Sequence, residues 1–166
     1  MYSAEQLKVY SLLADVKDPE VPVLSILDLG IVRNVEISDQ GGKQNVHVYI
    51  TPTYSGCPAM DAIAIGIRMA LTGRGFGSIQ VTHQLQPAWT TDWMTEEGKR
   101  KLKEYGIAPP QRKSTEKLAL FEEENIACPR CESTDTQLVS RYGPTSCKSL
   151  YKCNSCLEPF EHFKCH

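Results

Sequence analysis

The sequence lacks an excess of charge of either sign. Its 18 lysines and arginines nearly balance 20 aspartates and glutamates, which leaves a formal net charge of −2. A protein that binds nucleic acid through its phosphates normally presents a strongly basic face. We therefore expect no nucleic-acid partner.

Long apolar runs are also missing. No window of the 166 residues approaches the length needed to cross a bilayer. The first residues show no basic stretch followed by an apolar one, which is the pattern of a secretory leader. We therefore expect a cytoplasmic protein without a membrane partner. Seven cysteines in a reducing compartment indicate metal ligands or reactive thiols rather than disulfides.

Motifs of common redox enzymes are absent as well. The sequence contains no flavin or nucleotide motif, and the Glu-x-x-His pattern of diiron bundles does not occur. No histidine lies close to Cys57 in the sequence to act as its base. An enzyme that uses Cys57 as a nucleophile is therefore the least favoured class of function.

Four of the cysteines form two pairs, Cys128-Pro-Arg-Cys131 and Cys153-Asn-Ser-Cys156. This spacing lets both sulfurs of a pair turn onto one ion, so the pattern predicts a tetrahedral thiolate site, most often a structural zinc. A redox dithiol pair and a rubredoxin-like iron site use the same residues and stay open as alternatives. We expect metal binding to supply most of the folding free energy of so short a segment.

Two further cysteines, Cys147 and Cys165, complicate the count of ligands. Either could replace one of the four, but packing as a small apolar residue is the favoured interpretation of each. His162 and His166 are weaker candidates.

The chain before these cysteines predicts an α/β (α+β) fold. A capping box at Ser3 and Gln6 opens a first helix. An antiparallel hairpin follows, with strands at 31–37 and 45–51. A second helix is expected at 58–71 and a third strand at 79–85. Because a helix joins the last two strands, we expect them to be parallel. The second helix is apolar on most faces, so we expect it to be well buried.

A last helix is predicted at 95–105, with Gly106 as its left-handed cap. The composition then turns to Pro, Lys, Glu and Ser, which is typical of a linker, with a short docking turn at Leu118, Leu120 and Phe121. The predicted organisation is a mixed-sheet α-β-β-α-β sandwich at 1–107, a linker at 108–127 and a zinc-ribbon hairpin at 128–166. The hairpin strands are expected at 137–142 and 150–152.

Cys57 stands alone in the segment Thr51-Pro-Thr-Tyr-Ser-Gly-Cys57-Pro58. Proline suits the first position of a helix, so we place Cys57 at the N-cap of the second helix. The positive end of the helix dipole would favour a thiolate there. Such a thiolate suits a nucleophile or a soft metal ligand, whereas a cysteine that only packs is equally compatible with the spacing.

Two other groups of residues are candidates for function. An acidic loop that could support a metal or orient the thiolate contains Asp18, Glu20 and Asp28. Acidic residues in such proline-containing loops more often cap turns. A surface for a partner could be formed by Trp89, Asp92 and Trp93, although packing of the last helix onto the sheet explains these residues equally well.

Four segments resemble the SufT-like metal-sulfur cluster assembly domain: Asp18-Pro-Glu20-Val-Pro22, Asp28-Leu-Gly30-Ile-Val-Arg33-Asn34-Val35, Thr51-Pro-Thr-Tyr-Ser-Gly-Cys57-Pro58 and Pro87-Ala-Trp89-Thr-Thr-Asp92-Trp93-Met94. The cysteine-rich tail extends the likeness. With Gly143-Pro-Thr-Ser-Cys147-Lys and Glu158-Pro-Phe160-Glu-His-Phe163-Lys-Cys165, nearly the whole chain is similar to PaaD. PaaD is the D-component family associated with the ring-1,2-phenylacetyl-CoA epoxidase.

This resemblance implies a bacterial role in aerobic phenylacetate catabolism. The epoxidase combines a diiron oxygenase component with a reductase that carries flavin and an iron-sulfur cluster, and the D component is an accessory protein rather than an enzyme. The resemblance assigns Cys57 as the motif cysteine and Asp18 and Glu20 as its acidic loop. It assigns the tail's metal ligands as Cys128, Cys131, Cys153 and Cys156.

The leading hypothesis is therefore a maturation factor. Cys57 would transiently hold iron or an iron-sulfur cluster, shared across a homodimer because one cysteine cannot hold a cluster alone. The alternative is a non-catalytic adaptor whose zinc ribbon bridges the oxygenase or reductase components of the epoxidase. A thiol enzyme that uses Cys57 is the third interpretation.

Overall fold

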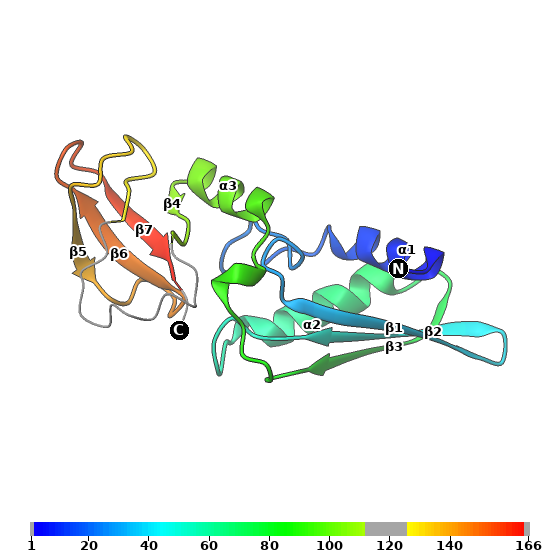
Figure 1. The fold of residues 1–166 in the computed structure, drawn as a ribbon. Coiled ribbons are helices and arrows are strands. Elements are labelled where there is room, and N and C mark those ends of the chain that lie inside the picture. The colour runs from blue at the N-terminus through cyan, green and yellow to red at the C-terminus, as the bar shows by residue number, and fades with distance from the viewer. Residues whose placement is uncertain (1, 112–125, 165–166) are drawn as a thin grey trace. The chain divides into compact units, whose positions relative to one another are not determined.

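The computed structural model describes residues 2–111 and 126–164 (Figure 1). Its contacts divide the chain into two compact units, Met1–Trp89 and Thr90–His166. Each unit contains a sheet of its own. Within the described ranges, no helix is both long and apolar enough to cross a membrane.

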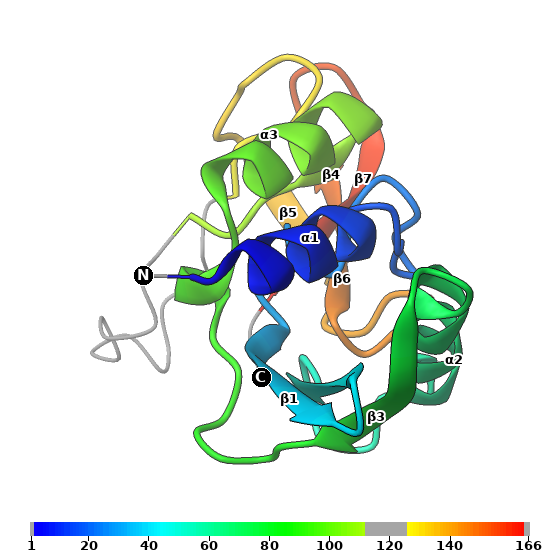
Figure 2. The same ribbon diagram turned by 90° about the vertical axis from the view of Figure 1, so that its right-hand side faces the viewer.

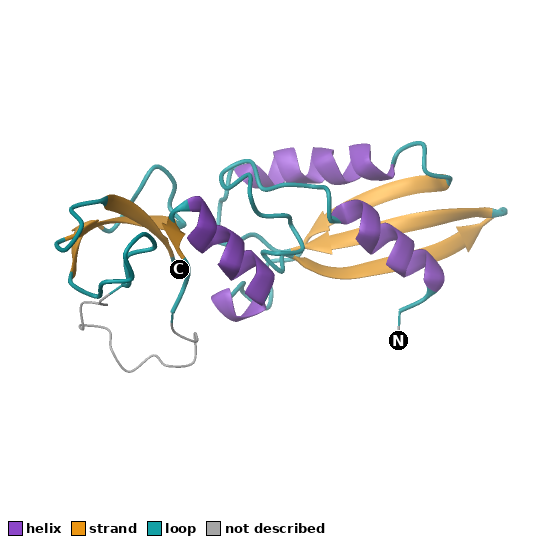
Figure 3. Ribbon diagram, turned by 90° about the horizontal axis from the view of Figure 1, so that it is seen from above, coloured by secondary structure: helices purple, strands orange, loops and turns teal. Residues whose placement is uncertain are grey.

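The first unit is a three-stranded sheet with two helices. In chain order its elements are α1 (Ala4–Leu13), β1 (Val32–Gln40), β2 (Lys43–Ile50), α2 (Ala59–Leu71) and β3 (Phe76–His83). The strand order is β1-β2-β3, with β1 antiparallel and β3 parallel to β2. The predicted hairpin and parallel crossover are therefore confirmed, and both helices run beside the strands (Figure 3).

The core of this unit lies on one face of the sheet. Val46, Val48 and Ile50 of β2 are buried, whereas the residues between them are only partly buried. This alternation is what a strand with one covered face produces. Figure 2, which looks along the strands, shows α1 and α2 on the same side of the sheet.

The first helix begins as the sequence predicts. The Ser3 hydroxyl oxygen accepts a hydrogen bond from the Gln6 backbone N–H at 3.1 Å, and the Gln6 side-chain oxygen accepts one from the Ser3 N–H at 2.9 Å. This reciprocal pair satisfies two backbone donors that the helix cannot satisfy itself. Val9 and Leu13 then point into the core, where both are fully buried.

The expectation that α2 is buried on most faces is wrong. Ile63 and Ile67 are buried, but Ile65 is 55% exposed and Met69 is 72% exposed. A helix that lies on one face of a sheet contacts it along a single stripe, so apolar residues outside that stripe stay exposed. The exposed apolar side of α2 bears on the further inference drawn below.

The second unit is built around a four-stranded sheet. Its elements are the short helix η1 (Thr91–Trp93), α3 (Glu96–Tyr105), β4 (Ile107–Ala108), β5 (Thr136–Ser140), β6 (Lys148–Cys153) and β7 (Pro159–Phe163). The strand order is β4-β7-β6-β5. The predicted β5–β6 hairpin is antiparallel, β7 is antiparallel to β6, and β4 is parallel to β7.

The helix α3 has the predicted ends. The Thr95 hydroxyl accepts a hydrogen bond from the Gly98 N–H at 2.9 Å, and Gly106 adopts the left-handed conformation with φ of 93°. The chain passes directly from Gly106 into β4, which pairs with β7. The structure therefore divides the chain before α3, whereas the expected boundary lay at residue 107.

The expected linker at 108–127 is described only at its ends. Ala108 belongs to β4, and residues 112–125, which contain the expected docking turn, lie outside the described residues. The small core of the second unit draws on both sides of this segment. It consists of Ala108, Ile126, Cys128, Tyr151, Cys153 and Phe160.

Candidate functional site

The four paired cysteines converge in the second unit. The sulfurs of Cys128, Cys131, Cys153 and Cys156 all lie within 4.8 Å of one another. The Cys128–Cys156 sulfur distance is 3.7 Å and the Cys131–Cys153 distance is 3.5 Å. Zinc–sulfur bonds of about 2.3 Å in a tetrahedron place neighbouring sulfurs roughly 3.8 Å apart. The donor set and its geometry therefore fit a closed, structural zinc site.

The two Cys-x-x-Cys turns have the same backbone design. The N–H of Cys128 donates to the Ser133 carbonyl at 2.9 Å, and the N–H of Cys153 donates to the Glu158 carbonyl at 2.9 Å. The residue after each pair, Glu132 or Leu157, has a φ of 62°. Each turn thus folds back on itself and presents both of its sulfurs on one side.

Electrostatics within the second turn favour the thiolate that metal binding requires. The Cys156 N–H donates to the Cys153 sulfur at 3.5 Å. This backbone donor, with the Ser155 N–H and the neighbouring thiols, lowers the pKa of Cys153 to about 6, whereas the contacts with the other sulfurs raise the pKa of Cys131. An ion pair between Arg130 and Glu158, at 2.5 Å, joins the first turn to the second.

The other candidate ligands of this unit lie elsewhere. Cys147 is buried just before β6, whereas Cys153 ends that strand, a length of about 20 Å. The Cys147 sulfur lies 3.1 Å from the Thr145 hydroxyl. His162 is buried on β7, and among the described residues neither side chain joins the four-sulfur group. Cys165 and His166 lie outside the described residues.

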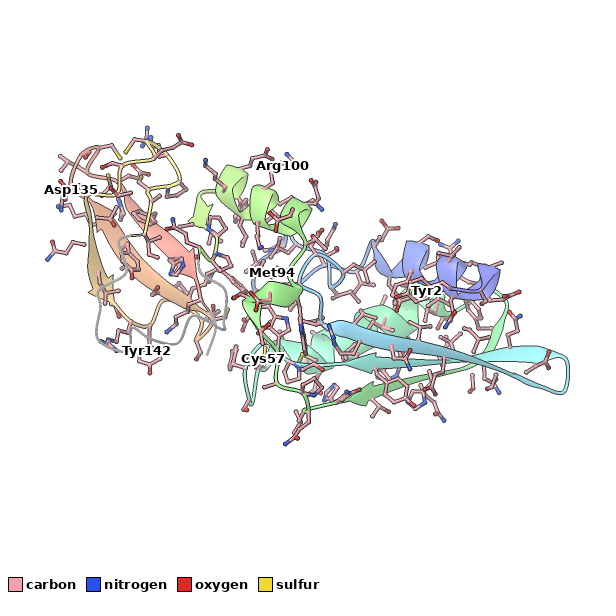
Figure 4. The ribbon with its side chains drawn as sticks, in the orientation of Figure 1. Tyr2, Cys57, Met94, Arg100, Asp135 and Tyr142 are labelled. Atoms are coloured by element: carbon pink, nitrogen blue, oxygen red, sulfur yellow. The ribbon has the colours of Figure 1, made fainter. Side chains whose placement is uncertain are left out.

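Cys57 lies in the loop that leads into α2 (Figure 4). The N-cap of α2 is Pro58, so Cys57 directly precedes the cap position at which we expected it. The Cys57 N–H donates to the Tyr54 carbonyl at 3.2 Å, and Gly56 has a φ of 79° between them. This tight turn, which needs the conformational freedom of glycine, holds the half-buried thiol in place.

The surroundings of Cys57 oppose the expected preference for the thiolate. Burial raises the pKa of the Cys57 thiol, and the negative charges of Glu20 and Asp18 raise it further. The Ala59 N–H and the Tyr54 side chain donate to the sulfur and lower its pKa, but they do not outweigh burial and the two acids. Tyr54 is a neighbour of the thiol that sequence reasoning missed, although it lies within the recognised segment.

Two of the three residues of the acidic loop, Asp18 and Asp28, cap turns, and Glu20 does not share these bonds. The Asp18 carboxylate accepts from the N–H groups of Glu20 and Val21 at 2.7 and 2.8 Å. The Asp28 carboxylate accepts from the Ser25 N–H and hydroxyl at 2.9 and 2.8 Å. Both aspartates are buried, while Glu20 is half-buried and close enough to shift the pKa of Cys57.

The three residues considered as a partner surface have different environments. Trp89 is 4% exposed and its indole N–H donates to the Leu29 carbonyl at 2.8 Å, so it packs inside the first unit. Asp92 and Trp93 belong to η1 of the second unit, where Asp92 is exposed and Trp93 is half-buried. Packing therefore explains Trp89, and Asp92 and Trp93 keep some accessible surface.

Comparisons with known proteins match the two parts of the chain separately. A model of the iron-sulfur cluster assembly protein family matches residues 6–82, and a model of the PaaD zinc beta ribbon domain matches residues 112–164. A crystal structure of a domain of unknown function, DUF59, from Bacillus anthracis has a TM-score of 0.55 and 28% identity. It covers 60% of this chain and 92% of that one. The fold of the first unit is therefore shared with that domain.

Two curated relatives match at the level of sequence. The chain is 34% identical over 90 residues to an Fe-S protein maturation auxiliary factor of Porphyromonas gingivalis (strain ATCC BAA-308 / W83), covering 54% of this chain and 82% of that protein. It is 49% identical over 158 residues to an Escherichia coli (strain K12) protein provisionally named as the D component of 1,2-phenylacetyl-CoA epoxidase. That match covers 95% of this chain and 92% of the relative. The chain therefore belongs to the PaaD family of epoxidase D components, with an iron-sulfur cluster assembly domain followed by a zinc ribbon.

Proposed function

We propose that this protein is an accessory maturation factor of a phenylacetyl-CoA epoxidase system in aerobic phenylacetate catabolism. It assists the assembly of iron or an iron-sulfur cluster in a client component, which is the oxygenase or the reductase. The observation that carries this proposal is a half-buried cysteine beside two carboxylates, within a domain that matches iron-sulfur cluster assembly proteins.

The chemistry of Cys57 suits transient binding of this cargo. A thiolate is a strong ligand for iron and for iron-sulfur clusters, whereas a single cysteine leaves most ligand positions of a cluster unfilled. The remaining ligands must come from outside the turn that holds Cys57. Glu20 is near enough to raise the pKa of the Cys57 thiol, and its carboxylate could contribute one of these ligands.

The zinc ribbon supports this role without taking part in the chemistry. Four cysteine ligands close the coordination sphere of zinc, and a closed sphere leaves no position for a substrate. Zinc bound by the four cysteines would cross-link the two Cys-x-x-Cys turns. The ribbon then serves as a stable surface for docking the client.

A second candidate function is an adaptor that bridges the epoxidase components without handling iron. The turn-capping roles of Asp18 and Asp28 favour it, because those two carboxylates have a structural explanation. In this function Cys57 is a packed thiol and the ribbon carries the activity. The two functions make different predictions for a substitution at Cys57.

The first test measures zinc, iron and acid-labile sulfide per polypeptide after anaerobic purification. For a maturation factor, we expect zinc near one per chain in the wild type and in Cys57→Ser, and iron and sulfide that disappear only in Cys57→Ser. A matched control is Ser55→Ala, an exposed substitution in the same turn. Zinc alone in every variant, together with full epoxidase activity in cells that carry Cys57→Ser, would instead support the adaptor.

A further inference from the structure

The two edges of the first sheet differ in how they are protected. The edge strand β1 carries charged side chains at Arg33, Glu36 and Asp39. The other edge strand, β3, reads Phe-Gly-Ser-Ile-Gln-Val-Thr-His and contains neither a charged residue nor a proline. Charges and prolines are the usual means of keeping an edge strand from pairing with another chain. The described residues place no strand on the outer side of β3.

The helix α2 adds an exposed apolar side next to this unprotected edge. A groove of about 580 Å³ runs between the two elements, lined by Asp61, Ile65 and Arg68 of α2 and by Val81, Thr82 and His83 of β3. Ile65 is 55% exposed. Met69, one helical turn further along α2, is 72% exposed. Neighbouring exposed apolar side chains with polar residues around them mark interaction surfaces.

The charges along this side of α2 identify the partner. Asp61 and Arg68 lie two helical turns apart, about 10.5 Å along the axis, with Ile65 near the midpoint. Neither side chain forms an ion pair with another residue in the described part of the chain. A two-fold axis near Ile65 brings Asp61 of each copy opposite Arg68 of the other copy, so the two ion pairs are related by symmetry. The surface is therefore complementary to itself, as an isologous dimer interface must be.

We propose that β3 and the Asp61–Ile65–Arg68 side of α2 form a two-fold interface between two copies of this chain. The β3 strands pair antiparallel, centred near Val81, and join two three-stranded sheets into one of six strands. α2 runs antiparallel to β3, because it leads from the end of β2 to the start of β3. The midpoint between Asp61 and Arg68 therefore lies beside the middle of the Ile79–His83 stretch, so one axis serves both contacts.

Cys57 precedes α2, whose first residue, Ala59, lies about 8 Å from the axis along the helix. The antiparallel helices therefore place the two Cys57 loops at opposite ends of the interface. The interface does not depend on a cluster shared between the two copies. The proposal stands apart from the maturation role, since the dimer can exist whether or not Cys57 holds metal.

Sedimentation equilibrium of the zinc-loaded full chain tests the interface. We expect a dimer for the wild type, and a monomer for Ile65→Glu, which places two like charges at the axis. Leu7→Glu is the matched control, because Leu7 is a 57% exposed apolar residue on α1 of the same unit. It should remain dimeric.

A charge exchange tests the register. Asp61→Arg alone should raise the dissociation constant of the dimer at least about tenfold, because it sets like charges opposite each other. The double variant Asp61→Arg/Arg68→Asp should restore the wild-type constant to within roughly threefold. A wild-type monomer, a dimer that survives Ile65→Glu, or a double variant that stays as weak as the single one overturns the proposal.

Discussion

His162 lies on β7 with only 5% of its surface exposed. Its ring meets the Tyr151 ring edge-on, with centroids 5.8 Å apart, and its Nδ1 lies 3.4 Å from the Ser149 hydroxyl. Within the described ranges its Nε2 has no hydrogen-bond partner. A charged imidazolium would be poorly solvated there, and burial lowers the pKa of His162 to about 4.

This burial predicts that the ribbon loses stability in mild acid. The pKa of His162 is lower in the folded than in the unfolded chain, so the unfolded state binds more protons between pH 4 and 6.5. The stability that the neutral His162 contributes is complete above pH 6.5. The free energy of unfolding falls by up to about 3 kcal/mol as the pH drops through this window. Hydrogen-exchange protection of the β6 and β7 amides at several pH values measures it.

One substitution separates this effect from other titrations in the ribbon. His162→Phe should flatten the pH dependence, because it removes the buried imidazole. Zinc content is measured at each pH, because protons also compete with zinc for the thiolates. A pH dependence that is unchanged in His162→Phe would contradict the assignment.

At the scale of single elements, two leucines of α1 lie in different environments. Leu13 is fully buried, and Leu7 is 57% exposed on the same helix. Leu13→Ala should lower the free energy of unfolding by about 3 kcal/mol, from lost burial and the cavity left behind. Leu7→Ala should change it by less than about 0.5 kcal/mol. Urea unfolding of the two variants measures the difference, and equal losses would contradict the packing of α1 described here.

Elements whose signals are local could be predicted from the sequence. The capping box at Ser3, the left-handed cap at Gly106 and the paired cysteines each depend on residues within a few positions, and the structure contains all three. The two-residue strand β4 could not be predicted, because it is a strand only through its pairing with β7, more than fifty positions later.

The surroundings of Cys57 show the same limit. Its position before α2 follows from the adjacent proline, to within one residue. The direction of its pKa shift does not, because it depends on burial and on carboxylates from a distant loop. Tyr54 reaches the sulfur through a turn at Gly56 whose geometry the residue order alone does not specify. The exposed side of α2 likewise depends on which face packs against the sheet.

At the scale of the whole molecule, the two units should respond differently to removal of zinc. The ribbon's core is small, and two of its six members, Cys128 and Cys153, belong to the four-sulfur group. The first unit has a core of its own and no cysteine in the four-sulfur site. A strong chelator should therefore abolish the protection of β5–β7 amides and leave that of β1–β3 intact.

Hydrogen exchange followed by mass spectrometry measures both sets of amides in one sample. Restoring zinc should return the protection of β5–β7. Cys153→Ser, without chelator, should reproduce the loss, whereas Lys152→Ala, at the exposed position of the same strand, should not. Equal loss of protection in both sheets would show that folding of the first unit also depends on zinc.

The pairing of β4 with β7 determines where this protein can be cut. Cutting the chain after residue 111 would leave α3 and β4 on the first fragment. Strand β7, with which β4 pairs, would be on the second fragment. The ribbon matched at residues 112–164 would thereby lose an edge of its sheet, and the preceding fragment would gain a helix and strand without their partner. A break between Trp89 and Thr90 keeps both sheets whole. Complementation with separately expressed halves, or fusion of the ribbon to another protein, should therefore succeed at that junction and fail at the later one.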